Sequence, residues 1–404
     1  MRRLVYFFLI TGFVHISYGL YVSTWRPIIF ASQSTVANES KFYDYPGAVH
    51  VQTTQSTGGR SVEEVLKAAK LAGLKFVVFT DFNNFSIDVN SEIAVEDVLA
   101  ISGGKYSYLD SRLLNIDMKT TDHLQGPGRS QVTFADILSE KNFAKSEGLF
   151  YLAHPYKPGY FFTPPYPIGI DGIELLNLKA IWQEAWIKSR GSFIWNCFLY
   201  PFNSNLAYIR MLARAGGKEL SLWDELNKAS PTYGVYGSDA EARVTLFRTM
   251  NLEFPSYQTL FSIIKNHLLI KSELTGNASQ DRKKISDALR GGQYYMSADI
   301  LQNPQGFETY ILKSDATPIP MGSLIAFSAD SELFVKLPAK PVVPFEVHVY
   351  KDGERVMTSN SVNTSYVIPA PGNYRVSVRL KVPMPFPERS RWVNWIVANP
   401  FFIR

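Results

Sequence analysis

Short apolar runs alternate with amphipathic stretches over the first three quarters of the chain. Residues 76–80, 149–153 and 233–237 are continuous apolar or aromatic runs, as in buried strands, whereas residues 62–72 carry apolar side chains at helical spacing. Residues 136–146, 208–215, 256–268 and 285–289 are also expected to be helical. This alternation predicts a mainly parallel α/β unit over residues 46–304.

The pattern changes after about residue 305. Short strands are predicted over residues 309–312, 333–335, 346–350, 365–368 and 374–380, with turn residues between them. Asp352 and Gly353 form a strong hairpin signal between two of these strands. Residues 305–404 are therefore predicted to form a small all-β sandwich domain, which we expect to pack against the first unit.

The first 25 residues have the form of a secretory signal or signal anchor. Two arginines precede an uncharged stretch from Leu4 to Trp25, which is long enough to span a membrane. Residues 26–45 are polar and irregular and are predicted to be a tether. We expect an exported protein, periplasmic or extracellular, with retention on the membrane favoured over release.

Composition limits the possible partners. The net charge of +5 is spread along the chain with no basic cluster, so nucleic acid is not an expected partner and a small anionic ligand is weakly favoured. The lone cysteine, Cys197, excludes an intramolecular disulfide, and its aromatic surroundings predict a buried small hydrophobe.

Residues 178–232 form a long aromatic segment that is predicted to be helical. Its four tryptophans indicate either a lid over one end of the α/β unit or helix faces that are buried against that unit; they are Trp182, Trp186, Trp195 and Trp223.

Candidate chemistry lies at the ends of the apolar runs. Four runs deliver an imidazole or a carboxylate at or just past their carboxyl-terminal ends: His50, Asp81, His154 and Asp239. In β/α barrels this edge of the sheet collects the reacting groups, and these residue types are ligands of divalent metals.

At these positions the sequence resembles the polymerase and histidinol phosphatase (PHP) superfamily of metal-dependent phosphoesterases. The family's opening His-x-His run corresponds to His50-Val-Gln52, its Thr-Asp-His to residues 80–82, its His-Pro to residues 154–155, and its Gly-Ser-Asp-Ala-His to residues 237–241. The matches keep the family's order over residues 46–299. The resemblance implies a distorted seven-stranded (β/α) barrel and a cluster of divalent ions such as manganese, zinc or iron.

The departures from the family pattern fall on its metal ligands. The family places imidazoles where Gln52, Phe82 and Glu241 stand, and a bridging glutamate near Lys105. A cation at that point repels a divalent ion. The resemblance therefore leaves a ligand set for one ion or none: His50, Asp81, His154, Asp239 and Glu241.

Two functions are consistent with this reduced set. The first is a weakly active phosphoesterase in which His50, His154, Asp239 and Asp81 hold one ion that activates water, with His154, Asp81 and Lys105 as candidate catalytic residues. The Lys105 ammonium is also suited to replacing the lost metal charge and holding an anionic ligand. The alternative is a non-catalytic protein of the same fold that binds an anionic ligand or an envelope partner. Purely structural roles are also consistent with two of these residues: Asp81 is suited to capping a turn and Glu241 to a solvated loop. His123 is a weak candidate to replace a missing imidazole.

Overall fold

Strand β1 (Tyr43–Val51) lies at the centre of the larger sheet. The computed structural model describes residues 2–31, 40–83, 94–117, 132, 148–167, 169–246, 250–314 and 317–404. The carboxyl-terminal half of β1 pairs in parallel with β2 (Phe76–Phe79) and β9 (Tyr233–Ala240), and its first half pairs antiparallel with β12 (Lys265–Ile270). β1 begins inside the predicted tether of residues 26–45.

The strand pairings around β1 return to their starting point. β2 pairs in parallel with β4 (Val98–Ile101), which continues after one residue as β5 (Gly103–Tyr108). β6 (Ser111–Ile116) follows, then β7 (Leu149–Ala153) and β8 (Gly172–Asn177), which pairs with β9. β6 runs antiparallel to both of its neighbours, so the predicted mainly parallel arrangement holds for only part of this circuit.

The helices next to this sheet follow the predicted amphipathic pattern in two places. α2 (Val62–Leu71) starts with a capping box between Ser61 and Glu64, and α9 (Ala278–Arg290) covers the prediction over residues 285–289. The long helix predicted over residues 256–268 is wrong. α8 (Tyr257–Phe261) ends early, and the apolar residues after it are strand β12, which hydrogen-bonds to β1. The predicted helix at 136–146 and His123 lie outside the described residues.

Residues 178–232 are helical, as predicted. They form α4 (Leu178–Lys188), α5 (Arg190–Leu199), α6 (Ser204–Leu212) and α7 (Gly217–Ala229). Trp223 is buried, but Trp186 and Trp195 are 44% and 39% exposed, so burial explains only some of the tryptophans. Cys197, on α5, is exposed, so the prediction that it is buried is wrong.

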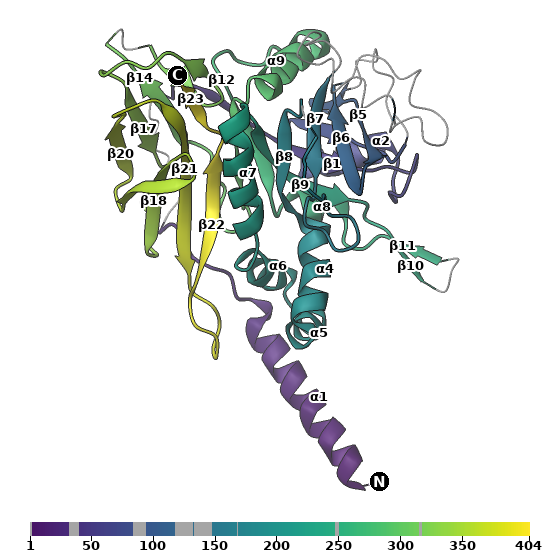
Figure 1. The fold of residues 1–404 in the computed structure, drawn as a ribbon. Coiled ribbons are helices and arrows are strands. Elements are labelled where there is room, and N and C mark those ends of the chain that lie inside the picture. Colours follow the sequence, from purple (N-terminus) through teal and green to yellow (C-terminus); the bar gives the residue numbers. More distant parts are fainter. Residues whose placement is uncertain are drawn as a thin grey trace.

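The carboxyl-terminal part consists of β-strands in two sheets. β15 (Ile319–Pro320), β14 (Glu308–Leu312), β17 (Glu332–Lys336) and β20 (Asn363–Val367) form the smaller sheet in that order. β19 (Glu354–Ser359), β18 (Phe345–Lys351), β21 (Gly372–Val382) and β22 (Arg391–Ala398) continue through β13 (Tyr294–Ser297) into β12. The fold is therefore mixed α/β with a second, all-β part, and one sheet extends across both (Figure 1).

Short pairs complete the fold. β3 (Ala94–Val95) joins β4, β10 (Val244–Leu246) pairs with β11 (Met250–Leu252), and β16 (Leu324–Ile325) pairs with β23 (Phe401–Ile403). The predicted hairpin at Asp352-Gly353 joins β18 to β19, and both residues have positive φ.

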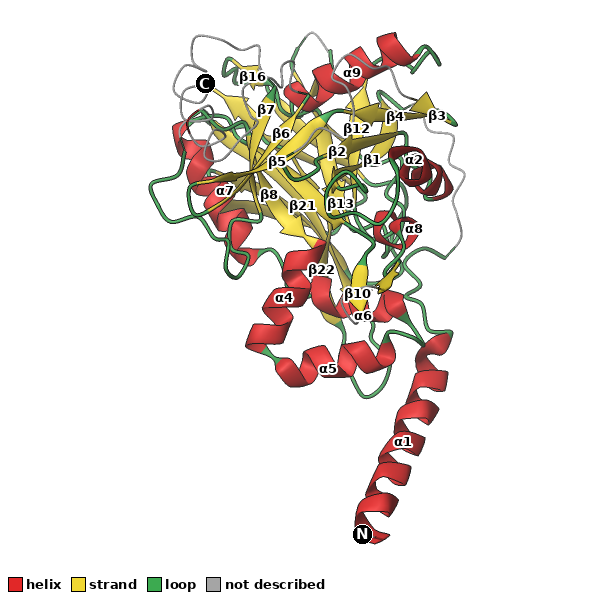
Figure 2. Ribbon diagram, turned by 90° about the vertical axis from the view of Figure 1, so that its right-hand side faces the viewer, coloured by secondary structure: helices red, strands yellow, loops and turns green. Residues whose placement is uncertain are grey.

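Helix α1 (Arg2–Ser23) projects from the end of the molecule where α4, α5 and α6 lie (Figures 1 and 2). Residues 3–23 are long and apolar enough to cross a membrane, by length and composition.

Candidate functional site

Three of the predicted site residues lie at strand ends with an unusual backbone. His50, His154 and Asp239 occupy the ends of β1, β7 and β9 and have φ angles of 63°, 32° and 43°. The pairing of β1 with both of its parallel neighbours shifts register next to His50. Residues other than glycine reach this left-handed region at a cost of roughly 1–3 kcal/mol and concentrate at functional sites. The backbone here aims these side chains at one point.

The Asp239 carboxylate is the centre of the site. Its Oδ1 lies 3.1 Å from His50 Nε2 and 3.2 Å from Lys105 Nζ, and it accepts a 3.0 Å hydrogen bond from Gln52 Nε2. Its Oδ2 accepts a 3.0 Å hydrogen bond from Lys157 Nζ. Burial alone would raise the pKa of Asp239, but the cations of His50, Lys105 and Lys157 hold it well below the usual range. Asp239 is therefore a buried carboxylate whose two oxygens are already paired with cations.

Glu174, in the middle of β8, holds both histidines in place. Its Oε1 lies 2.7 Å from His50 Nδ1, and its Oε2 accepts a 2.6 Å hydrogen bond from the backbone N–H of His154. Asn177 donates to both oxygens at 3.1 Å. Gly237 leaves room for this carboxylate, because a Cβ there would lie 1.5 Å from Oε1. Burial lowers the pKa of His50, but the carboxylates of Asp239 and Glu174 outweigh it, so the pKa is raised.

His154 faces the ring of His50, with the two ring centroids 6.0 Å apart. Its Nδ1 is buried and has no hydrogen-bond partner among the residues that the structure describes. Burial, and then the ammonium of Lys157, lower the pKa of His154 well below its usual value. The residue is therefore a neutral imidazole with an unsatisfied ring nitrogen, which is available to a ligand.

Asp81 serves the turn that follows β1. It accepts from the backbone N–H of Thr53 at 2.7 Å, from the Thr53 hydroxyl at 2.9 Å and from Ser56. The next residue, Phe82, forms a bridge with Lys105, and the guanidinium of Arg112 lies 5.1 Å from its ring centroid. A cation–π contact thus occupies the position where the family has an imidazole.

Glu241 joins the cluster through Gln52 and Lys179. Its Oε1 accepts from Gln52 Nε2 at 3.3 Å and from Lys179 Nζ at 2.7 Å. Burial lowers the pKa of Lys179, but Asp239 and Glu241 outweigh it and the pKa is raised. Glu241 is thereby paired with a cation, as Asp239 is.

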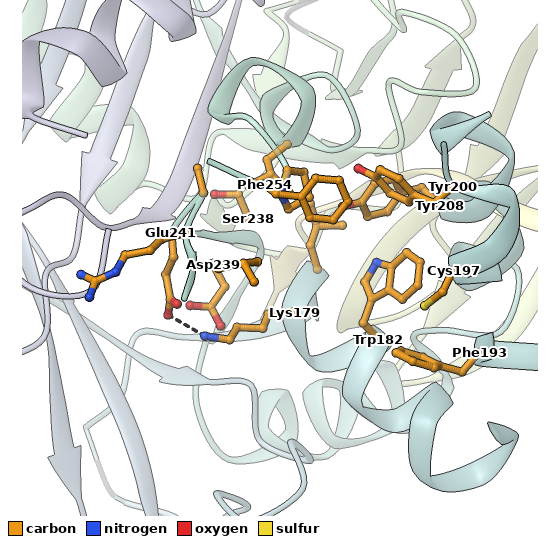
Figure 3. A pocket seen from close by; sticks show the side chains of 16 residues that line it. Lys179, Trp182, Phe193, Cys197, Tyr200, Tyr208, Ser238, Asp239, Glu241 and Phe254 are labelled. Carbon is orange, nitrogen blue, oxygen red and sulfur yellow. Dashed lines mark hydrogen bonds and ion pairs between the residues drawn. The ribbon is translucent and has the colours of Figure 1, made fainter. Parts of the chain in front are cut away.

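A pocket of about 380 Å³ opens beside this cluster between α4, α5, α6 and the end of β9. Asp239, Glu241 and Lys179 lie at one end of it, and aromatic side chains line the rest (Figure 3). The aromatic wall consists of Trp182, Phe193, Tyr200, Tyr208 and Phe254. An apolar pocket with a few polar groups at one end is the usual form of a small-molecule site.

The residues present do not fit the divalent metal that the resemblance implies. Within the described parts of the chain, no group of three or more His, Cys, Asp or Glu side chains could hold a metal ion. Lys105 and Lys157 both bind Asp239, and their charges repel a divalent cation at that point. The two ammonium groups therefore already occupy the Asp239 oxygens to which a metal ion would have to bind.

The structure brings together most of the predicted residues and adds others. His50, Lys105, His154, Asp239 and Glu241 belong to one connected cluster, while Asp81 binds the adjacent turn. Sequence reasoning missed Lys157 and the role of Glu174. Glu174 lies in an apolar run like the other site residues and so carried a usable signal, whereas Lys157 lies in the loop after His154, where a lysine is usually solvated.

Comparisons with known proteins give little beyond the geometry. No family model and no curated protein matches the sequence. One similar solved structure is a two-domain protein from Bacteroides vulgatus ATCC 8482 that contains a predicted PHP-like metal-dependent phosphoesterase. The identity is 9%, the match covers 92% of this chain and 98% of that chain, and the TM-score is 0.37. At that score the likeness does not establish a shared fold, so PHP membership stays a prediction from sequence motifs.

Proposed function

We propose that this chain is an exported PHP-like protein, held on the membrane by α1, whose former metal site now binds an anionic amphipathic ligand without metal-dependent catalysis. The membrane attachment is supported by contacts between α1 and the folded part. Asn203 Nδ2 donates to the backbone oxygens of Val22 at 2.7 Å and of Trp25 at 2.8 Å. The helix end is thus part of the fold, which favours retention over cleavage.

The PHP-like part of the proposal is supported by strand order and by the location of the site. Counting β4 and β5 as one bent strand, the closed circuit runs through β1, β2, β4–β5, β6, β7, β8 and β9. His50, His154 and Asp239 lie at carboxyl-terminal strand ends, where barrel enzymes keep their reacting groups. The site is therefore in the place expected for an active site of this family.

The main support for the proposed loss of metal-dependent catalysis is the pairing of Asp239 with two lysines. Both ammonium groups are nearly buried, with side-chain exposures of 8% for Lys105 and 7% for Lys157. Buried charges need partners of opposite charge. Here Asp239 is the anion that pairs with both ammonium groups, and the two lysines are the cations that pair with its carboxylate. These three charged groups are therefore paired with one another without a metal ion.

The adjoining pocket supports the class of ligand. Its aromatic wall accommodates an apolar body, and Lys179, with a side chain 40% exposed, provides a cation at the polar end. In the adjoining cluster, His154 Nδ1 is a buried polar atom that no described residue satisfies. A phosphate or carboxylate attached to a hydrocarbon matches this combination of apolar wall and cation.

Metal content tests the proposal against the phosphoesterase alternative. The full chain, purified in detergent after expression with manganese, iron and zinc, is measured by mass spectrometry beside the His154→Ala variant. We expect less than about 0.1 equivalent of any metal in both. A tight catalytic site retains its ion during purification, so such a low content would mean that no such site is present. One or more equivalents in the parent that are lost in His154→Ala would overturn the proposal in favour of a metal-dependent hydrolase.

A further inference from the structure

Helix α5 packs along the side of α1. The His15 ring centroid lies 5.4 Å from that of Phe198 and 5.5 Å from that of Phe202, and Tyr18 lies 5.6 Å from Trp195. A Cβ on Gly19 would meet the Phe202 ring at 2.6 Å, so the glycine permits close approach. The contact therefore covers the stretch of α1 from His15 to Gly19.

The position of this contact along α1 fixes the depth of α5. A helix rises 1.5 Å per residue, so Gly19 lies roughly 6 Å and His15 roughly 12 Å before Ser23. Residues 3–23 are about as long as the ~30 Å hydrocarbon core of a bilayer. If α1 spans that core, the residues of α5 that touch it lie below the membrane surface. Apolar helices that lie in the interface are buried to a similar depth of ~5–10 Å.

The outer surface of α4 and α5 has the composition that this depth requires. It exposes large apolar side chains: Trp186 (44%), Ile187 (60%), Ile194 (44%), Trp195 (39%) and Phe198 (57%). Lys188 and Arg190 flank the turn between the two helices, and the Arg190 guanidinium lies 5.3 Å from the Trp186 ring centroid. Apolar and aromatic side chains with basic residues beside them are typical of helices that enter a membrane surface.

We infer that the tip of the α4–α5 hairpin is inserted in the outer leaflet of the bilayer that α1 crosses. The inference rests on the membrane attachment that forms part of the proposed function. Trp195 and Trp186 then lie at the level where aromatic side chains concentrate in membrane proteins, and Lys188 and Arg190 reach lipid phosphates. Because Trp182 and Phe193 of the same helices line the pocket, the pocket lies next to the membrane, and its hydrocarbon-bearing ligand enters from there.

Spin labels in the full chain test this inference. In a Cys197→Ser background, a nitroxide is attached at Ile194→Cys, at Phe13→Cys within α1, or at Lys283→Cys on α9, which lies at the far end from α1 (Figure 1). The protein is reconstituted into vesicles of phosphatidylcholine and phosphatidylglycerol. Collisions with oxygen, which partitions into lipid, and with a water-soluble nickel chelate report the depth of each label.

We expect the labels at positions 194 and 13 to be at least fivefold more accessible to oxygen relative to nickel than the label at position 283. A label at position 194 that matches position 283, while position 13 is in lipid, would overturn the insertion of α5 and leave the anchor intact. A label at position 13 exposed to nickel would overturn the anchor and, with it, the insertion. The two failures are therefore distinguishable.

Discussion

Lys157 Nζ donates a 3.0 Å hydrogen bond to Asp239 Oδ2, and both side chains are buried. Lys157 follows β7 and Asp239 lies near the end of β9, so the ion pair joins two strand ends on either side of β8. The other oxygen of Asp239 faces Lys105, which lies in β5. The pair thus holds the mouth of the strand circuit together with charges that the chain itself supplies.

Replacing Lys157 with methionine should destabilise the fold by about 2 kcal/mol. The change keeps most of the apolar stem but leaves Asp239 Oδ2 buried without its cation, and the remaining partners on Oδ1 offset only part of that loss. Urea unfolding of the full chain in detergent measures the effect. Lys283→Met, at a lysine 77% exposed, is the matched control and should change stability by less than ~0.5 kcal/mol. A loss for Lys157→Met no larger than the control's would show that the pair is not needed.

Gly237→Ala should disrupt the cluster by displacing Glu174. The added Cβ would lie 1.5 Å from Glu174 Oε1, which cannot move without leaving His50 Nδ1 and Asn177. We expect a loss of about 3 kcal/mol or more, because a buried carboxylate would lose its partners. Gly217→Ala, where a Cβ meets open space at the start of α7, should stay within ~0.5 kcal/mol. Equal melting temperatures for the two variants would contradict the packing around Glu174.

The sequence predicted the elements whose pattern is local. Residues 62–72 fold as the expected helix because a capping box and an amphipathic pattern agree, and Asp352-Gly353 turns as expected because both residues adopt positive φ. The prediction of helix is wrong for residues 265–268 because a short apolar run fits either structure. Their strand conformation depends on hydrogen bonds to β1, more than 200 residues earlier, which no local pattern records.

The site was predictable where a residue type recurs at strand ends, and not where partners come from loops. His50, His154 and Asp239 end apolar runs, so the sequence placed them at one edge. Lys157 was missed because a lysine after a strand is usually solvated, and only the fold buries it against Asp239. The prediction that Cys197 is buried fails because its aromatic neighbours do not enclose it: it is exposed and lines the pocket with Phe193 and Tyr200.

His267 should make the stability of the chain fall as pH rises from 6.5 to 9. Its ring lies 2.7 Å from Asp44 and 3.2 Å from Asp299; burial lowers its pKa, but these carboxylates outweigh it and raise the pKa to about 9. A raised histidine pKa stabilises the fold below 6.5, and this stabilisation is lost as pH rises through 9. At ~1.4 kcal/mol per tenfold change in proton affinity, the contribution is about 3 kcal/mol.

Unfolding free energies of the parent and of His267→Gln between pH 6 and 9.5 measure this contribution. His50, whose pKa is also raised, has the same sign and acts in both proteins, so the difference between the two curves isolates His267. The parent should lose about 3 kcal/mol more than the variant across this range. Parallel curves would show that His267 is neutral in the folded chain.

Lys179→Met should weaken the binding of a short anionic amphiphile about tenfold without affecting its uncharged counterpart. The Lys179 ammonium is the cation at the polar end of the pocket, and it has Glu241 as its partner at 2.7 Å. A phosphate that shares this ammonium gains a charge-assisted hydrogen bond, and a tenfold loss of affinity corresponds to ~1.4 kcal/mol.

Titration of full-length protein in nanodiscs with hexyl phosphate and with hexanol, followed by tryptophan fluorescence, measures both affinities. Lys228→Met, at an exposed lysine on α7 outside the pocket lining, is the matched control and should bind both compounds as the parent does. If hexyl phosphate binds no better than hexanol to the parent, the pocket has no preference for an anion and the assigned ligand class is wrong.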